Sequence, residues 1–191
     1  MLDSSNVYKL AGLKVGTFKP VNLMTLQLNS AVPDFELPAL DGRLYRLSDH
    51  RGKIVIVNFW SCECPQSERT DRTILSMLVQ WQDIVLLTVA SNRNESVEAI
   101  KTVAEARHLQ TVLLDQNSRV ADQFKAKTTP HVFVIDREGI LRYRGSVDNV
   151  TFRQRVPTRF FLDEAVESLL EGHFPALAES PAYGCSIVRE I

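Results

Sequence analysis

The sequence predicts an α/β domain in which a central mixed β-sheet is flanked by helices. The segment Ile54–Trp60 is apolar at consecutive positions and rich in β-branched and aromatic residues, as expected for a strand buried on both faces. Strand-like and helix-like segments then alternate along the chain, which is typical of a layered domain with parallel strands. Asp136–Gly139 is a turn signal between two short apolar runs, which indicates an antiparallel hairpin at one edge.

The composition excludes several classes of function. The chain has 191 residues, 45% of them hydrophobic and 24% charged, which suffices for one domain with a full core. A net charge of −1 gives no electrostatic case for binding nucleic acid or an anionic membrane. No apolar run approaches the ~20 residues of a membrane span, and the N-terminus lacks the apolar core of a signal peptide. A cytoplasmic protein is therefore expected.

Three parts of the chain differ in character. Residues 1–29 have no clear pattern and form an expected N-terminal extension. Residues 30–172 contain the alternating elements and form the expected domain. Residues 173–191 are rich in Pro, Ala and Ser and form an expected C-terminal tail, which carries Cys185.

Short strands are expected before the buried strand, and a helix after it. Phe35–Leu37 and Leu44–Leu47 flank the turn signal Asp41-Gly42, which predicts a pair of short strands. After the buried strand, Pro65 opens a helix, because the missing N–H of proline costs nothing in a first helical turn. The apolar residues from Ile74 onward recur at i, i+3, i+4 and i+7, the spacing of one helix face.

The rest of the domain continues the alternation. Ile84–Ala90 is a second apolar run and predicts another buried strand. The elements predicted after it are, in order, a helix with Glu95 and Glu98 in its first turn, a strand Thr111–Leu114, a short helix Asn117–Phe124, a strand His131–Ile135, its hairpin partner Ile140–Tyr143 and a helix Leu162–Leu170.

Two of the three cysteines lie where the buried strand turns into a helix. Cys62 and Cys64 stand between Trp60 and Pro65. Three cysteines are too few for a disulfide scaffold, so they point to thiol chemistry or metal binding. A thiol at a helix N-terminus meets the positive end of the helix dipole and unpaired N–H donors, which favour the reactive thiolate. The position therefore predicts that Cys64 is reactive.

Three motifs around these elements resemble the thioredoxin fold. They are the run Asn58–Trp60 shortly before Cys64-Pro65, Thr129-Pro130 before a strand, and Asp136–Gly139 in the following hairpin. The resemblance implies a thiol–disulfide oxidoreductase in which Thr129-Pro130 is a cis peptide beside the reactive cysteine. It also implies a free backbone edge there, able to pair with an extended segment of a thiol substrate.

Further motifs resemble one group within that fold. Val32–Phe35 and Leu40–Gly42 resemble the redoxin family, also described as alkyl hydroperoxide reductase and thiol-specific antioxidant. Gly184–Ile187 resembles the tail of a redoxin subgroup that ends in the same Gly-Cys-Ser-Ile sequence. The resemblance covers about residues 30–188. It implies a role in cell redox homeostasis, with antioxidant activity as one form of it.

The chain departs from both kinds of thiol enzyme in this fold. Thioredoxin-like reductases carry C-x-x-C at this turn, whereas Ser67 stands at the second cysteine position. Peroxiredoxins resemble the chain in Cys64-Pro65 and Ser61, but Val57 replaces their proline, and Pro130-His131 lies where their arginine is expected. That arginine would stabilise the thiolate and the leaving oxyanion. A weak thiol peroxidase is therefore the alternative to a thiol oxidoreductase.

The partner of Cys64 stays undecided between Cys62 and Cys185. A Cys62–Cys64 disulfide closes a tight ring whose preferred geometry is hard to reach, so it would be readily reduced. Cys185 lies in a tail that could fold back onto Cys62 or Cys64. The simpler alternatives are a spectator thiol on an exposed loop for Cys62 and a free surface thiol for Cys185.

Five other residues are expected to bind the substrate at this site. Thr129 and Pro130 would shape the substrate edge, and Ser61 and Ser67 would offer hydroxyls to the thiolate. Trp60 would lie against the substrate or, alternatively, in the core.

A non-enzymatic alternative is a metal site. Cys62, Cys64 and His131 offer two soft thiolate ligands and an imidazole, a set that suits copper or zinc. Otherwise His131 is expected to be a strand histidine that faces solvent, and no cofactor is expected. A third alternative is a binding protein that uses the free edge near Pro130.

The expected partners follow from this chemistry. They are protein or small-molecule thiols and disulfides, peroxide in the peroxidase alternative, and a thiol reductant such as a thioredoxin system. Nucleic acid and membrane are not expected, and a homodimer is left open. The sequence does not identify the substrate or the electron donor.

Overall fold

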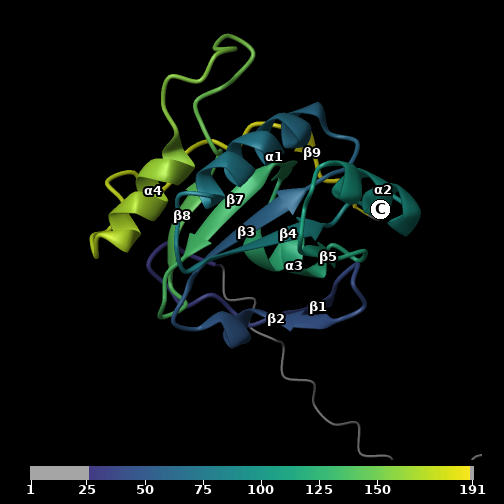
Figure 1. The fold of residues 1–191 in the computed structure, drawn as a ribbon, viewed down its shortest axis with the longest axis horizontal. Helices are drawn as coiled ribbons and strands as arrows, with labels where there is room; N and C mark the ends of the chain where they lie inside the picture. Colours follow the sequence, from purple (N-terminus) through teal and green to yellow (C-terminus); the bar gives the residue numbers. More distant parts are fainter. Residues whose placement is uncertain (1–25, 190–191) are drawn as a thin grey trace, which may run out of the picture.

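The computed structural model describes residues 26–189, so most of the expected N-terminal extension lies outside the described residues. A five-stranded sheet, in the order β5-β4-β3-β7-β8, forms the centre of the domain (Figure 1). The first three strands of the chain in this sheet run parallel, and the last two are antiparallel, as the late hairpin predicted. The strands are β3 (Ile54–Trp60), β4 (Ile84–Ala90), β5 (Val112–Leu114), β7 (His131–Ile135) and β8 (Leu141–Gly145).

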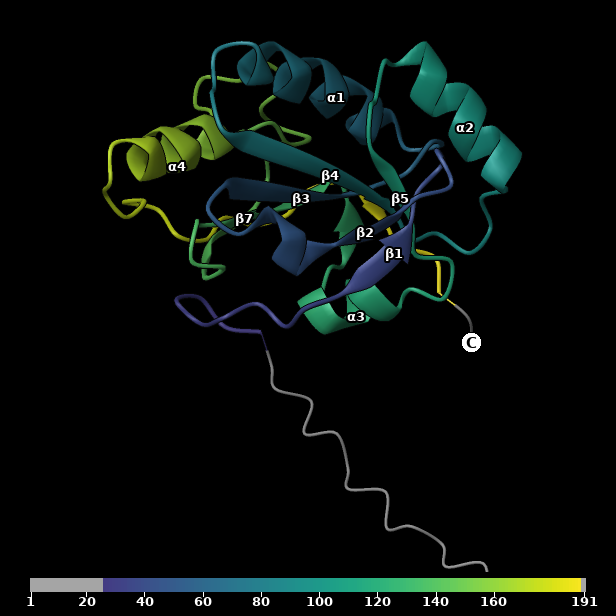
Figure 2. The same cartoon turned by 60° about the horizontal axis from the view of Figure 1, so that its bottom comes forward.

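Helices cover both faces of this sheet (Figure 2). The helices α1 (Pro65–Leu78) and α4 (Phe161–Leu170) pack on the face that carries Ile54 and Ile56 of β3. The short helix α3 (Arg119–Phe124) lies on the opposite face. Alternate residues of β3 therefore enter two separate cores, which is why this strand is apolar at consecutive positions.

Two further elements flank the sheet. The helix α2 (Val97–Ala106) packs with Trp60 at the end of β3. Its N-cap is Ser96, whose side chain accepts a hydrogen bond from Ala99 N, so Glu95 precedes the helix instead of lying in its first turn. The strands β1 (Glu36–Pro38) and β2 (Leu44–Arg46) form the expected short hairpin, followed by the 3₁₀ helix η1 (Leu47–His50). Among the helices of the described residues, none has the length and hydropathy that a membrane span needs.

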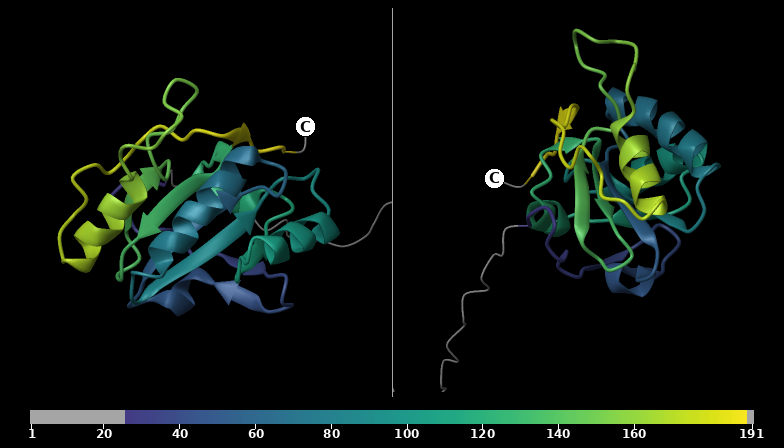
Figure 3. Two further views of the ribbon diagram at one scale, coloured as in Figure 1. Left: turned by 45° about the horizontal axis from the view of Figure 1, so that its top comes forward. Right: turned by 90° about the vertical axis from the view of Figure 1, so that its left-hand side faces the viewer.

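The C-terminal tail forms a strand that the sequence did not predict. Strand β9 (Cys185–Ser186) pairs antiparallel with β6 (Thr128–Thr129) as a separate two-stranded sheet. Figure 3 shows the tail leaving α4 and running back across the domain toward the N-terminal end of α1. Ile187, just after β9, is buried in the main core. The tail therefore folds back onto the place where the buried strand turns into a helix.

Candidate functional site

Cys64 is the N-cap residue of α1, with Pro65 in the first turn. Its backbone is extended, with φ −84° and ψ 118°, so the chain turns sharply from β3 into the helix at this residue. The Cys64 side chain makes no cap hydrogen bond, but the backbone N–H groups of Gln66 and Ser67 lie near enough to the sulfur to lower its pKa. These are donors that a helix leaves without a backbone partner in its first turn. The local sequence thus places a thiol on the positive end of a helix, as predicted.

Two other segments of the chain close around this sulfur. Cys64 Sγ lies 3.0 Å from the carbonyl oxygen of Thr129, to which the thiol form donates. Cys185 on β9 lies opposite Thr129, and its thiol is near enough to the same sulfur to lower the pKa of Cys64. Cys64 is 1% exposed, whereas Cys185 is exposed to solvent. The first turn of α1, β6 and β9 therefore meet at one buried sulfur atom.

Opposing influences act on the pKa of Cys64. Burial raises it and is the largest single influence. Hydrogen bonds from the Cys185 thiol and from the backbone N–H groups of Ser67, Cys185 and Gln66 act in the other direction. The Thr129 carbonyl favours the thiol, because it accepts from that form. The donors outweigh burial, and the pKa of Cys64 is lowered from its ordinary value.

The pKa of Cys185 is shifted in the opposite direction. Burial, together with the hydrogen bond to Cys64 and the negative charge there, raises the pKa of Cys185 to about 11. Within the pair, loss of a proton is therefore favoured at Cys64 over Cys185. Both cysteines are free thiols in this structure.

Backbone pairing holds Cys185 in this place. Cys185 lies opposite Thr129 in the β6–β9 ladder, and Thr129 Oγ1 donates to the Cys185 carbonyl oxygen at 3.5 Å. Ile187 N donates to the Lys127 carbonyl oxygen at 3.1 Å. Gly184 passes so close to Thr129 that a Cβ atom on it would overlap the Thr129 carbonyl oxygen. A glycine is therefore required where the tail crosses β6.

Side chains anchor the tail on both sides of Cys185. Before it, the Ser180 hydroxyl lies 2.6 Å from the Tyr143 hydroxyl and accepts from Ser146 N at 3.0 Å. After it, Val188 N donates to Asn92 Oδ1 at 2.9 Å. Arg189 then pairs with Asp122 at 2.7 Å and also donates to the Ala126 carbonyl oxygen.

The cis peptide expected at Thr129-Pro130 is present. The backbone edge beside it is not free, however, because β9 pairs with Thr128 and Thr129. The resemblance predicted an open edge here. The edge is closed because the tail supplies the strand, β9, that pairs with it.

Cys62 lies on the other side of Cys64 and is buried at 6% exposure, not on an exposed loop. Burial, followed by the negative charges of Glu95 and Glu63, raises the pKa of Cys62 to about 11. A hydrogen bond from the Cys62 thiol to the Glu95 carboxylate acts in the same direction. These contacts hold Cys62 as a thiol.

Glu95 is a residue of this site that the sequence analysis missed. It is buried, and one carboxylate oxygen accepts from the Ser61 hydroxyl and, at 3.1 Å, from Asn92 Nδ2. Position alone did not reveal it, because an acidic residue near a helix start is usually a solvated one. The nearby Ser91-Asn92 and Ser96, all able to bond a carboxylate or cap a helix, were the available signal.

The two serines do not play the roles expected of them. The Ser61 hydroxyl donates to Glu95 and accepts from Glu63 N at 3.2 Å, so it is not offered to Cys64. The Ser67 hydroxyl accepts from Ser61 N at 3.4 Å, and it is the Ser67 backbone N–H that helps to lower the pKa of Cys64.

Trp60 lies in the core instead of at a substrate surface. It is 0% exposed, and its indole N–H donates to Asp71 at 2.9 Å. The Arg107 guanidinium lies 5.7 Å from the Trp60 ring and pairs with Asp71 at 3.1 Å. A second arginine of this end, Arg69, forms a bidentate pair with Asp148 at 2.6 and 3.2 Å. Both arginines are thus committed to buried carboxylates.

His131 does not face solvent. It is 8% exposed and its ring lies 4.5 Å from Phe133, while its Nδ1 is buried without a hydrogen-bond partner among the described residues. Burial, with smaller contributions from the positive charges of Arg144 and Lys127, lowers the pKa of His131 to about 4. The residue stays neutral at ordinary pH.

The copper or zinc site is not formed. Within residues 26–189, no group of three or more His, Cys, Asp or Glu residues is placed to hold a metal ion. His131 pairs with Phe59 and shares its face of the sheet, whereas Cys62 packs with Trp60 on the other side. Adjacent residues of β3 point to opposite faces, so the fold separates these two ligands.

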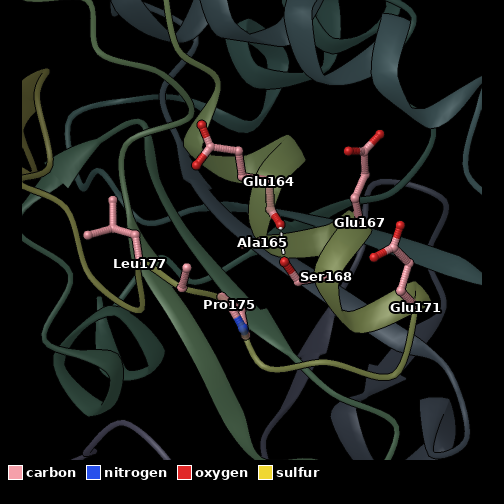
Figure 4. A pocket seen from close by; sticks show the side chains of 8 residues that line it. Glu164, Ala165, Glu167, Ser168, Glu171, Pro175 and Leu177 are labelled. Carbon is pink, nitrogen blue, oxygen red and sulfur yellow. Dashed lines mark hydrogen bonds between the residues drawn. The ribbon is translucent and has the colours of Figure 1, made fainter.

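A hollow of about 300 Å³ beside α4 lies apart from the cysteines (Figure 4). Glu164, Glu167 and Glu171 project from this helix around it. The Ser168 hydroxyl donates to the Glu164 carbonyl oxygen at 2.7 Å within the helix, so it is not a free nucleophile. The candidate chemistry therefore stays with the sulfur pair.

Comparison with known proteins supports the thioredoxin-like fold. The AhpC/TSA family matches residues 28–144. Among curated proteins, the thiol-disulfide oxidoreductase ResA of Geobacillus thermodenitrificans is 31% identical over 113 residues, which are 59% of this chain and 65% of that protein. The thiol:disulfide interchange protein DsbE of Escherichia coli K12 is 26% identical over 132 residues, 68% of this chain and 70% of that protein. The chain thus spans slightly less than two thirds of the length of ResA.

Solved structures agree with this fold. An uncharacterized conserved protein from Geobacillus kaustophilus superposes with a TM-score of 0.76 at 26% identity, over 86% of this chain and 93% of that one. The thioredoxin domain of a thiol-disulfide oxidoreductase from Bacteroides vulgatus superposes with a TM-score of 0.61 at 21% identity, over 75% of this chain and 98% of that one. The mixed sheet with flanking helices is therefore the expected thioredoxin-like fold.

Proposed function

Because this chain belongs to the AhpC/TSA family, we propose that it is a thiol–disulfide oxidoreductase that works through the pair Cys64 and Cys185. One observation carries the proposal. The tail pairs with β6 so that Cys185 lies opposite Thr129, whose carbonyl oxygen is 3.0 Å from the Cys64 sulfur at the N-terminus of α1, although Cys64 and Cys185 are far apart in the chain. The names of the distant relatives ResA and DsbE describe the same class of reaction.

The reaction passes two electrons between the pair and a client. In the oxidised protein, an S–S bond joins Cys64 and Cys185. A client with two thiols breaks that bond through a mixed disulfide, leaves with its own S–S bond, and returns the pair to two thiols. A small-molecule disulfide accepts the two electrons in turn, is released as two thiols, and restores the internal bond. Protons lost by one pair of thiols are taken up by the other.

The environment of Cys64 suits this exchange in both directions. Its lowered pKa increases the fraction of thiolate, which is the attacking form. The same stabilisation makes Cys64 the better leaving group when the internal disulfide is broken. Cys185 holds a proton in the reduced pair, so the two sulfurs have different roles.

Cys62 is not the partner in this proposal. Cys62 lies beside the negative charges of Glu95 and Glu63, which disfavour its thiolate. Cys185 instead lies opposite Thr129, whose carbonyl oxygen contacts the Cys64 sulfur. A peroxidase is also less well supported, because the Ser61 hydroxyl is bound to Glu95 and the arginines Arg69 and Arg107 are paired with carboxylates.

A disulfide map tests the proposal. The protein is oxidised with a small aliphatic disulfide, its free thiols are blocked in acid, and its peptides are analysed by mass spectrometry. We expect a Cys64–Cys185 bond in the wild type. Replacing Cys64 or Cys185 by Ser should lower the rate of exchange between a dithiol and a small disulfide about a hundredfold, whereas Cys62→Ser should change it less than about twofold.

Two results would count against the proposal. One is a map with a Cys62–Cys64 bond or with no bond at all. The other is a loss of activity in Cys62→Ser as large as that in Cys185→Ser. Circular dichroism and thermal unfolding of each variant check that the fold is retained.

A further inference from the structure

Access from solvent differs sharply between the two sulfurs of the proposed pair. Cys64 is 1% exposed, whereas Cys185 is exposed. A disulfide exchanges by direct attack of a thiolate on a sulfur atom, so the attacking group must reach that atom. The cysteine with the lowered pKa is therefore the less accessible of the two.

The tail is what covers Cys64. Cys185 and Gly184 cross β6 directly beside Thr129, whose carbonyl oxygen contacts the Cys64 sulfur. The edge of β6 would otherwise be open to strand addition by an extended peptide, and β9 occupies it. The protein's own tail thus blocks access to the Cys64 sulfur and also occupies the adjacent backbone edge of β6.

The docked tail is held by many contacts. Ile187 is 6% exposed within the main core, and Arg189 is paired with Asp122. Ser180 is bonded to Tyr143 on the other side of Cys185. Uncovering Cys64 would require these buried and charged contacts to break, whereas Cys185 can be reached without any such change.

We propose that external thiols attack Cys185 of the oxidised pair, and that Cys64 acts as its internal partner beneath the docked tail. This inference rests on the proposed function, because it assigns an order of events to the same pair. The sequence led us to expect the opposite order, with Cys64 as the attacking thiolate and Cys62 or Cys185 resolving. The exposures of the two residues motivate the change.

The exchange between a client dithiol and the oxidised pair has two steps. A client thiolate attacks the sulfur of Cys185 in the oxidised pair, and the electron pair of the broken S–S bond leaves on Cys64. Cys185 and the client are then joined by a disulfide. A second thiolate of the client attacks the client's own sulfur and expels Cys185, which takes up a proton. The client has lost two electrons to the protein, and the pair is reduced.

The helix N-terminus supports this direction of attack. Of two possible leaving groups, the thiol with the lower pKa leaves faster. The donors around Cys64 lower its pKa, so attack on Cys185 releases the better leaving group. Exposure and leaving-group chemistry therefore favour the same sulfur as the point of attack.

Single-cysteine variants test access. Cys62→Ser with Cys185→Ser leaves Cys64 alone, and its reaction with a dipyridyl disulfide is followed by the absorbance of the released thiopyridone. Truncation after Tyr183 in the Cys62→Ser background leaves Cys64 without its cover. We expect Cys64 to react at least about tenfold faster in the truncated protein than beneath the docked tail. Equal rates would overturn the proposal.

A second variant guards against misfolding of the truncated chain. Ile187→Asp, added to the variant that retains Cys64, places a charge in the core contact of the tail while the chain stays complete. It should speed the reaction of Cys64 in the same way. Val188→Asp is the matched control, because Val188 is exposed, and it should leave the rate unchanged.

Adduct mapping tests the order of attack. The wild type with its Cys64–Cys185 bond is treated briefly with N-acetylcysteine, quenched in acid, blocked and digested. We expect N-acetylcysteine on Cys185 and a blocked free thiol at Cys64. An adduct on Cys64 would overturn this inference and leave the proposed function intact. Failure to form the Cys64–Cys185 bond would instead count against the proposed function.

Discussion

The two flanks of Cys64 each carry one cysteine, and they place that cysteine in opposite ways relative to Cys64. The acidic flank consists of Cys62, Glu63 and Glu95. The tail flank consists of Lys127, Thr129, His131 and Cys185. Cys62 is almost adjacent to Cys64 in the chain, yet its thiol is turned to Glu95. Cys185 is far away in the chain, yet it lies opposite Thr129, whose carbonyl oxygen contacts the Cys64 sulfur.

Charge explains much of the contrast. The buried Glu95 carboxylate is held by Ser61 and Asn92, so it stays beside Cys62. A negative charge next to a thiol disfavours the thiolate. On the tail flank, the positive charges of Arg144 and Lys127 and the negative charge of Glu179 act on the buried imidazole of His131. Arg189 of the tail is paired with Asp122. Proximity in sequence therefore does not decide which sulfur serves Cys64.

The largest expected effect is a pH-dependent loss of stability caused by His131 on the tail flank. In the folded protein the pKa of His131 is lowered to about 4, while the unfolded chain binds the proton near the ordinary value. The neutral His131 therefore contributes its full share to the free energy of unfolding at a pH above the ordinary pKa. That free energy decreases by about 3 kcal/mol as the pH falls to about 4. Urea unfolding of the reduced protein between about pH 7 and about pH 4 measures this loss.

Replacing His131 isolates its contribution to the pH dependence of the free energy of unfolding. His131→Phe keeps a ring against Phe133 and cannot be protonated, so its free energy of unfolding should depend less on pH than that of the wild type. The control is His108→Asn on an exposed turn, which should behave as the wild type does. Identical pH dependence in His131→Phe and the wild type would show that burial on this flank has been misjudged.

The next effect concerns how closely the tail must approach β6. Gly184→Ala places a methyl group against the Thr129 carbonyl oxygen, so β9 must shift and carry Cys185 away from Cys64. We expect the Cys64–Cys185 bond to form about tenfold more slowly in a glutathione redox buffer, followed by mass spectrometry. Ser186→Ala, at an exposed position of the same strand, is the control. An unchanged rate in Gly184→Ala would break the contrast between the flanks.

The smallest effect concerns the acidic flank. Glu95→Gln removes the negative charge and keeps an oxygen that can accept from Ser61. The pKa of Cys62 should then fall from about 11, although burial still raises it. In a protein whose other two cysteines are Ser, alkylation of Cys62 in mildly alkaline buffer should become about threefold faster. Glu98→Gln, on the exposed face of α2, should have no effect.

Much of the fold could be predicted from the sequence. The β3 strand was visible because both of its faces are buried, so its residues are apolar without interruption. The start of α1 was visible because Pro65 is a local signal for a first helical turn. The hairpin of β7 and β8 was predicted from a turn of four residues between apolar runs.

The elements that the sequence did not predict are those without local signals. Strands β6 and β9 have two residues each, too few for any periodicity, and they form only because they pair with each other. The orientation of His131 was also wrong, because a strand residue can face solvent or core, and only the partners across the sheet decide which.

The sequence by itself determined that Cys64 is at the N-terminus of a helix after a buried strand. That conclusion depends on consecutive residues, and consecutive residues carry the strand pattern and the proline signal. Only the tertiary structure decided that Cys185 contacts Cys64 while Cys62 faces Glu95. These contacts join segments distant in the chain, and their effects on a thiol act through space, at distances that the fold alone sets.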